Sequence, residues 1–309
     1  MNFGSSNGPS SQNGAADHHH SPSPSQTAPS QNDYSADASV FQSHDQRIVD
    51  HISQNGFQSG QYADVFLHVH QTTFRLHSLI VSQSPYFLAH LSQGNEICVD
   101  SGSASQVTLE GLRIALSYLY SSKALHEIQP SNAREALAAA CLLGGMDELC
   151  SYSYEMCVRS LTPESIDEWI KFVDGMPSSQ EAAEAHLLGQ YAPKLQQRVF
   201  DYLVKTLPDV LLQAADGRSK LVHIYSGAPF DIFKAALEST SFKTEPNGAA
   251  SSSVHRRFKF AKDCIDLRKR GISQGTDESV VVAFGGKLGG AGNIHITRKV
   301  RKRPLYKVS

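Results

Sequence analysis

The residues best suited to chemistry in this sequence are three histidines that lie close together. His68 and His70 are two positions apart, so a β-strand would project both side chains from one face, and His77 follows nearby. Three imidazoles can bind zinc. No fourth Cys, Asp or Glu ligand lies at a usual spacing, however, and a partly exposed strand accommodates histidine without any metal. We therefore expect no bound metal and no cofactor.

Other stretches that resemble catalytic or ligand-binding motifs lack a required residue. In GGKLGG the lysine is followed by Leu288, where a phosphate-binding loop has Ser or Thr, so a glycine-rich hairpin turn is the better interpretation. The triplet His18–His20 lies in a polar segment that offers no fixed metal geometry. No GxSxG or HExxH motif is present, and no cysteine has a dedicated histidine partner. We expect the chain not to be an enzyme.

The composition predicts a folded body with a polar N-terminal tail. Hydrophobic residues make up 40% of the 309 residues, which is enough for a core. Residues 1–39 are mostly Ser, Asn, Gln, Gly, Pro and Ala, so we expect them to be disordered. No apolar run has the length of a membrane span and no signal peptide is recognisable, which predicts a soluble intracellular protein. The five cysteines include no CxxC pair, so we expect buried free thiols.

The first folded elements have mixed periodicity. Residues 40–53 place Ile48, Val49 and Ile52 on one helical stripe that needs a partner to cover it. Alternating residues then predict a hairpin over 65–76, and NEICVD predicts a further strand.

Between the hairpin and that strand, Ser84 is expected to cap a helix and Pro85 to occupy its first turn. Phe87, Leu88 and Leu91 are expected to form the apolar face of this helix. The sequence therefore predicts an α+β fold at the start of the chain.

From residue 109 onward the period becomes helical. Leu109, Leu112, Leu116 and Leu119 predict one helix, and two more precede residue 161. Residues 162–240 are predicted to be entirely helical. The clearest of these helices starts with a Thr162 cap and buries four apolar residues: Ile166, Trp169, Ile170 and Val173.

Residues 241–253 read as a linker, and residues 254–309 as a basic helix followed by a β-hairpin. This last segment holds 14 of the 28 Lys and Arg residues and four acidic ones. Its clusters, RKR at 268–270 and RKVRKRP at 298–304, are interpreted as a solvated charge run, a nuclear-targeting signal or a nucleic-acid contact. Interleaved aromatic residues are sparse, so nucleic acid is not expected as a partner. The residues that would form the nuclear-targeting signal are Arg298, Lys299, Arg301, Lys302 and Arg303.

The order of the segments ADVFLHV, FRLHSLIVSQSPYF, LRIALSYLYSS and EALAAACLLGGMDELC resembles the BTB/POZ domain. The match covers roughly residues 60–160, and with the N-terminal helix the domain would span 40–161. Residues 162–240 resemble the BACK-type helical extension, and the whole layout is similar to BTB proteins of filamentous fungi. The residues that carry the resemblance are Asp64, His77, Ser84, Tyr86, Phe87, Tyr118, Leu119 and Tyr120.

The resemblance implies a role in binding other proteins. Family members dimerise through the N-terminal helix, and many hold a cullin-type ubiquitin ligase while a second region captures the substrate. His77 is then expected to cap a helix or to form a local hydrogen bond. Ser78 stands where many relatives carry Arg or Lys, so the charged pocket of transcriptional members is not expected. LSQGNEI departs from the signature of cullin binders, with Leu91 and Glu96 as its partner-binding candidates.

We therefore expect a non-enzymatic homodimeric adaptor that recruits substrates to a cullin-type ubiquitin ligase. The alternative is a nuclear scaffold or transcriptional cofactor whose basic C-terminal segment directs it to the nucleus. The expected localisation is accordingly cytoplasmic, nuclear or both, with no membrane association.

Overall fold

The computed structural model describes residues 31–99, 107–177, 186–242, 244, 254–271, 276–283 and 293–300. It begins with helix α1 (Gln31–His51), which continues as the π-helical segment η1 (Ile52–Gln58). Residues 31–47 belong to one compact unit, and the chain from Ile48 onward forms the other. Residues 31–39 were predicted to be disordered, and this prediction is wrong at its end, because the segment contains no Gly or Pro that would stop a helix. The rest of the predicted tail lies outside the described residues.

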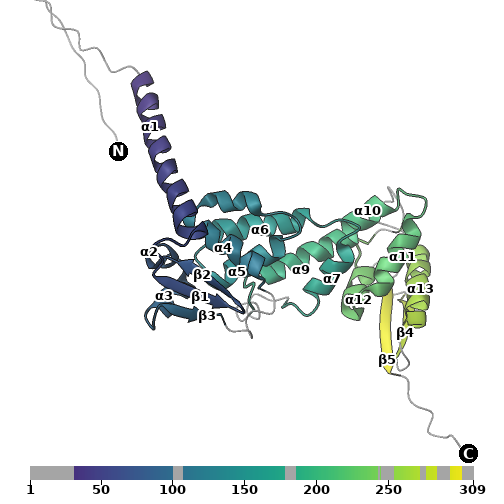
Figure 1. Ribbon diagram of the computed structural model, residues 1–309. Helices are drawn as coiled ribbons and strands as arrows, with labels where there is room; N and C mark the ends of the chain where they lie inside the picture. The colour runs from purple at the N-terminus through teal and green to yellow at the C-terminus, as the bar shows by residue number, and fades with distance from the viewer. Residues whose placement is uncertain are drawn as a thin grey trace, which may run out of the picture. The chain divides into compact units, whose positions relative to one another are not determined.

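A three-stranded sheet follows, with strand order β2-β1-β3 (Figure 1). Strand β1 (Val65–Val69) pairs antiparallel with β2 (Thr72–Leu76), and parallel with β3 (Glu96–Cys98). The side chains of Val65, Leu67 and Val69 all face the core, as their alternation predicts. The predicted hairpin and third strand are confirmed.

Helices cover this sheet and complete the first core. Gly111 of α4 allows a close approach of two of them, because a Cβ atom at this position would lie 2.2 Å from the carbonyl oxygen of Glu135 in α5. Leu112 and Leu116 of α4 are fully buried as predicted, whereas Leu109 is exposed. The helices are α2 (Ser78–Val81), α3 (Pro85–Leu91), α4 (Leu109–Tyr120), α5 (Ala133–Leu143) and α6 (Asp147–Arg159), with the 3-10 segment η2 (Ser122–Glu127) after α4.

Helices are the only regular elements in the described part of the next region. Its first helix, α7 (Ile166–Val173), buries all four predicted apolar residues. Thr162 does not cap it directly, because Ser165 holds the N-cap position and Thr162 accepts a hydrogen bond from the Ser165 backbone. The remaining elements are α9 (Tyr191–Asp201), η3 (Tyr202–Thr206), α10 (Leu207–Leu211), α11 (Gly217–Gly227) and α12 (Phe230–Glu238).

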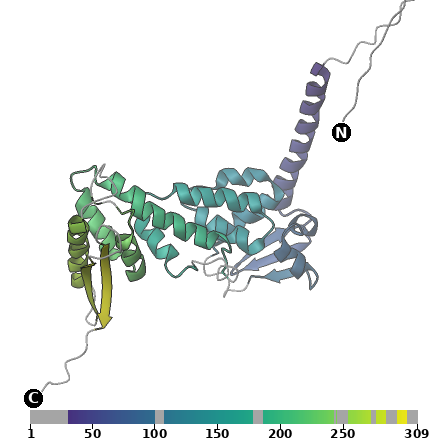
Figure 2. The ribbon, with the colours of Figure 1, turned by 180° about the vertical axis from the view of Figure 1, so that it is seen from behind.

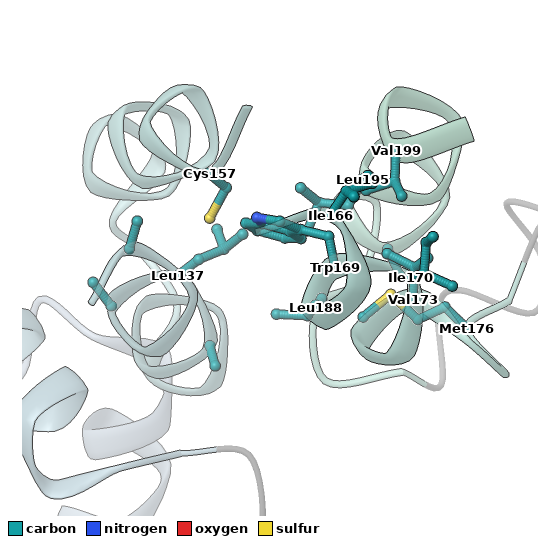
Figure 3. Packing of buried hydrophobic residues seen from close by; sticks show 14 of the residues in the cluster. Leu137, Cys157, Ile166, Trp169, Ile170, Val173, Met176, Leu188, Leu195 and Val199 are labelled. Carbon is teal, nitrogen blue, oxygen red and sulfur yellow. The ribbon is translucent and has the colours of Figure 1, made fainter. Parts of the chain in front are cut away.

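Trp169 joins the core of this region to that of the first one. Figure 3 shows its ring between Leu137 of α5 and Cys157 of α6 on one side and the α9 residues Leu195 and Val199 on the other. All five side chains belong to one continuous buried cluster. The helical region therefore packs directly on α5 and α6.

The basic C-terminal segment is folded. Helix α13 (Val254–Gly271) packs on α11, and strands β4 (Thr276–Ala283) and β5 (Asn293–Val300) form an antiparallel hairpin beside α12 and α13 (Figures 1 and 2). Arg268 donates hydrogen bonds to Glu278 of β4 and to the carbonyl oxygens of Ser226 and Ala228. The prediction of a helix and hairpin is confirmed, whereas a solvated charge run is wrong for Arg268, whose side chain is only 6% exposed.

No helix in the described ranges combines the length and the apolar character needed to cross a membrane.

Candidate protein-interaction site

His77 lies where β2 passes into α2, and it holds together three separate segments. Its Nδ1 atom is 2.9 Å from the Tyr120 hydroxyl, which also accepts a hydrogen bond from the His77 backbone N–H. Its Nε2 atom is 2.7 Å from the Gln61 carbonyl oxygen. A carbonyl can only accept, so Nε2 carries the proton and Tyr120 donates to Nδ1. His77 holds the N-cap position of α2 as predicted, but its side chain makes no capping hydrogen bond, and the partners of the ring are 16 and 43 residues away.

Asp64 performs the capping instead. Its carboxylate accepts hydrogen bonds from the backbone N–H and the hydroxyl of Ser78, the first residue of α2. These bonds hold the pKa of Asp64 below its usual value, so the residue is charged at neutral pH, at the positive end of the helix. Ser78 thus binds Asp64 through both its backbone and its hydroxyl.

The Tyr120 hydroxyl can be tested alone. Substituting Tyr120 with phenylalanine leaves the His77 N–H and Nδ1 without their partner in a partly buried place, so we expect a loss of about 1–3 kcal/mol in the free energy of unfolding. Urea denaturation measures this loss. The same change at exposed Tyr152 should stay within about 0.5 kcal/mol of the parent protein. Equal effects at both positions would mean that His77 does not depend on Tyr120.

The other family-motif residues also have structural roles. Ser84 does not cap α3 with its side chain as predicted, because its buried hydroxyl donates to the carbonyl oxygen of Leu143 at the end of α5. Tyr118 donates to Glu148 of α6 over 2.7 Å. Burial, together with this carboxylate, raises the pKa of Tyr118 to about 12. Phe87 is fully buried, and Tyr86 and Leu119 are partly buried against the core.

A cleft of about 330 Å³ opens beside His77 and Asp64. Its walls come from the end of α1, η1, the turn before β1, and α2. Two apolar side chains of the wall project into solvent, namely Tyr62, which is 93% exposed, and Leu79, which is 84% exposed. Tyr62 has a φ of +60°, a left-handed conformation that is unusual for an aromatic residue. Because His77 binds the adjacent Gln61 carbonyl, it fixes the turn that presents Tyr62.

The predicted dimerisation stripe borders this cleft. Ile52 lines it and is partly buried, Val49 is half-buried, and Ile48, one helical turn earlier, is 46% exposed. The structure thus places Ile52, the last residue of this stripe, in the same cleft as Tyr62 and Leu79.

The two predicted partner-binding residues lie apart from this cleft, around α3 and β3. Leu91 is half-buried. The leucine of α3 that faces solvent is Leu88, which is 61% exposed. The predicted apolar face of α3 is wrong for Leu88, because it lies about 100° around the helix from Phe87. The exposed carboxylate of Glu96 pairs with His68, whose Nδ1 lies 3.0 Å from the Thr73 hydroxyl.

The basic residues of the C-terminal segment are only partly described. Arg298 lies 3.8 Å from Glu278 and above the ring of Phe230, while Lys299 is exposed. Arg301, Lys302 and Arg303 lie outside the described residues.

One further cleft, of about 590 Å³, includes the residue types of a catalytic triad: Asp167, His223 and Ser226. The Ser226 hydroxyl, however, donates to the His223 backbone carbonyl over 2.7 Å. In the part of the chain that the structure describes, the His223 ring makes no hydrogen bond to either residue, and no three His, Cys, Asp or Glu side chains group as metal ligands. This geometry gives no support to catalysis or to the three-histidine zinc hypothesis.

Sequence reasoning missed Gln61, Tyr62 and Leu79, and it did not foresee that Ser78 binds Asp64. The partners of Ser78 and Gln61 are distant in sequence, so no local pattern could reveal them. Tyr62 and Leu79 resemble ordinary core residues in a periodic reading, and only their solvent exposure distinguishes them.

BTB/POZ domain-containing protein 2 of Schizosaccharomyces pombe is 28% identical to this chain over 262 residues. The aligned part covers 80% of this chain and 86% of that protein. Since 80% of the chain is more than residues 1–161 contain, the similarity extends into the helical region. No family model matches the chain. Taken with the mixed α+β fold, whose prediction is confirmed, this similarity supports a BTB/POZ identity for the chain.

Proposed function

We propose that this chain is a non-enzymatic adaptor that dimerises through the face around Tyr62 and Leu79 and recruits substrates to a cullin-type ubiquitin ligase. The observation that carries the proposal is the exposure of Tyr62 and Leu79 on the wall of one cleft, with Ile48 exposed one helical turn before Ile52, which also lines that cleft. Large apolar side chains gathered on a surface are typical of protein interfaces, and tyrosine is enriched where binding energy concentrates. BTB/POZ proteins are generally interaction modules, which agrees with this role.

A second copy of the chain is the proposed occupant of this face. Ile48 and Leu79 are expected to be covered in the dimer. A glutamate at each position would therefore place an unpaired charge in a buried interface. We expect the parent protein to have twice the mass of the chain at micromolar concentration in light scattering, and Ile48→Glu/Leu79→Glu to be monomeric. Val210→Glu, at an exposed position on α10, is the matched control and should remain dimeric. A monomeric parent protein would contradict the proposal.

The surface of α3 is the proposed cullin contact, with exposed Leu88 in place of Leu91 as the apolar anchor and Glu96 beside it. A pull-down from cell extract should recover a cullin with the full chain, lose it with Leu88→Asp, and retain it with Val210→Asp. Failure of the full chain to recover a cullin, in an extract where a known cullin-binding protein does, would refute this part. We also propose that residues 162–240 form a BACK-like region and that the chain is a BTB protein of the filamentous-fungal type.

A nuclear scaffold is the second candidate, supported by exposed Lys299 and the basic residues that follow it. A fluorescently tagged chain should then accumulate in the nucleus and lose this localisation when Arg301, Lys302 and Arg303 are replaced by alanine. The matched control replaces Lys259 and Lys262, which are exposed on α13. A purely cytoplasmic signal that ignores the substitution would remove this candidate.

A further inference from the structure

Cys141 of α5 and Cys150 of α6 face each other across the contact between these helices. Their Sγ atoms lie 4.0 Å apart. A disulfide bond places its sulfur atoms at about 2.05 Å, so the remaining gap of about 2 Å can close through side-chain rotation and a small helix shift. Among the described residues, the other thiols, Cys98, Cys157 and Cys264, make no hydrogen bond to a second sulfur. The pair is thus distinct in its geometry from every other cysteine described.

The surroundings of the pair allow a small oxidant to reach it. Cys141 is partly exposed, whereas Cys157 and Cys264 are fully buried. The hydrogen bond from the Cys141 thiol lowers the pKa of Cys150, and the same bond raises the pKa of Cys141. Cys150 is therefore the better nucleophile, with Cys141 as the thiol beside it.

We propose that Cys141 and Cys150 are a modification site, at which a peroxide converts two thiols into an intramolecular disulfide. The Cys150 thiolate attacks one oxygen of hydrogen peroxide, the O–O bond breaks, hydroxide leaves, and Cys150 becomes a sulfenic acid. Cys141 then attacks the Cys150 sulfur as the S–O bond breaks, and the departing hydroxide takes up the Cys141 proton as water. In total, two thiols are oxidised and one peroxide is reduced to two water molecules.

The disulfide changes the contact between α5 and the segment that leads into α9. In the thiol form, the Cys141 Sγ also lies 3.9 Å from the carbonyl oxygen of Leu188, so its one S–H proton is shared between this oxygen and the Cys150 sulfur. Leu188 is buried in the cluster around Trp169 (Figure 3). Oxidation removes this donor, so residues 186–192 are less firmly held against α5 and exchange their amide hydrogens faster.

The chain allows a precise test, because cleavage after Glu148 and Glu155 places Cys141, Cys150 and Cys157 on three separate fragments. The full chain carrying Cys98→Ser is treated with hydrogen peroxide, alkylated, cleaved and analysed by mass spectrometry. We expect fragments 136–148 and 149–155 to be linked, with Cys157 and Cys264 still alkylated. Cys157→Ser is the matched control and should retain the link.

Two variants separate the roles of the thiols. In Cys141→Ser, peroxide should leave Cys150 as a sulfenic acid that dimedone traps. In Cys150→Ser, dimedone trapping at Cys141 should be roughly tenfold lower than this trapping at Cys150, because the more reactive thiolate is lost. The proposal is overturned if the linked fragments are absent at a peroxide dose that oxidises Cys98 in the parent chain, or if Cys157 or Cys264 reacts as readily. Unchanged hydrogen exchange of residues 186–192 in the linked form would refute the coupling to Leu188.

Discussion

Replacing Arg268 with methionine is expected to lower the free energy of unfolding by about 3–5 kcal/mol, the range observed when one partner of a buried ion pair is removed. The Glu278 side chain, only 3% exposed, would lose its two hydrogen bonds from the guanidinium group. The carbonyl oxygens of Ser226 and Ala228 would lose their donor as well. Arg298 remains 3.8 Å from Glu278, but its side chain is 43% exposed, so it compensates only in part.

Guanidinium denaturation followed by circular dichroism measures this loss of stability. Two further variants test whether it comes from the buried ion pair. Lys269→Met, at the exposed neighbouring position, should change stability by less than about 0.5 kcal/mol. The double variant Arg268→Met/Glu278→Leu removes the stranded charge, so it should be at least about 2 kcal/mol more stable than the single one. If Arg268→Met and Lys269→Met behave alike, the C-terminal hairpin is not held by this pair.

The elements that carry Arg268 and Glu278 could be predicted from the sequence, but the contact between the two residues could not. The periodicity of residues 254–300 was sufficient to predict a helix and a hairpin, because each depends on neighbours within one segment. Charge counting could not identify Arg268 as buried, since its partners are two carbonyl oxygens 40 and 42 residues away and a glutamate on β4. The alternation that places Glu278 on the same face as Val280 and Val282 was the one available signal.

The candidate interaction site shows the same division. The apolar stripe that runs from α1 into η1 and the join at His77 could be found from local pattern, because their residue types repeat or match a motif. The contacts of His77 with Tyr120 and Gln61 depend on how α4 and the turn before β1 meet, which no local pattern specifies. The prediction of a helix at Leu88 was correct, but the prediction that Leu88 belongs to its apolar face was not. Of the adjacent pair, Phe87 points into the core and Leu88 does not.

Replacing Trp169, the single tryptophan of the chain, with alanine is expected to lower the free energy of unfolding by about 3–5 kcal/mol. Its ring is buried, meets Phe172 edge to face at 5.6 Å, and lies 5.2 Å from the Arg134 guanidinium carbon.

Because the ring fills the space between α5, α6 and α9, the loss should not be confined to the helical region (Figure 3). Hydrogen exchange should therefore increase in α5 and α6 as well as in α7 and α9. Circular dichroism must follow the unfolding, since the variant has no tryptophan fluorescence, and Trp169→Phe should recover roughly half of the loss, because it restores part of the buried volume. Unchanged exchange in α5 and α6 would show that the two regions unfold independently, and that the continuous core does not couple them.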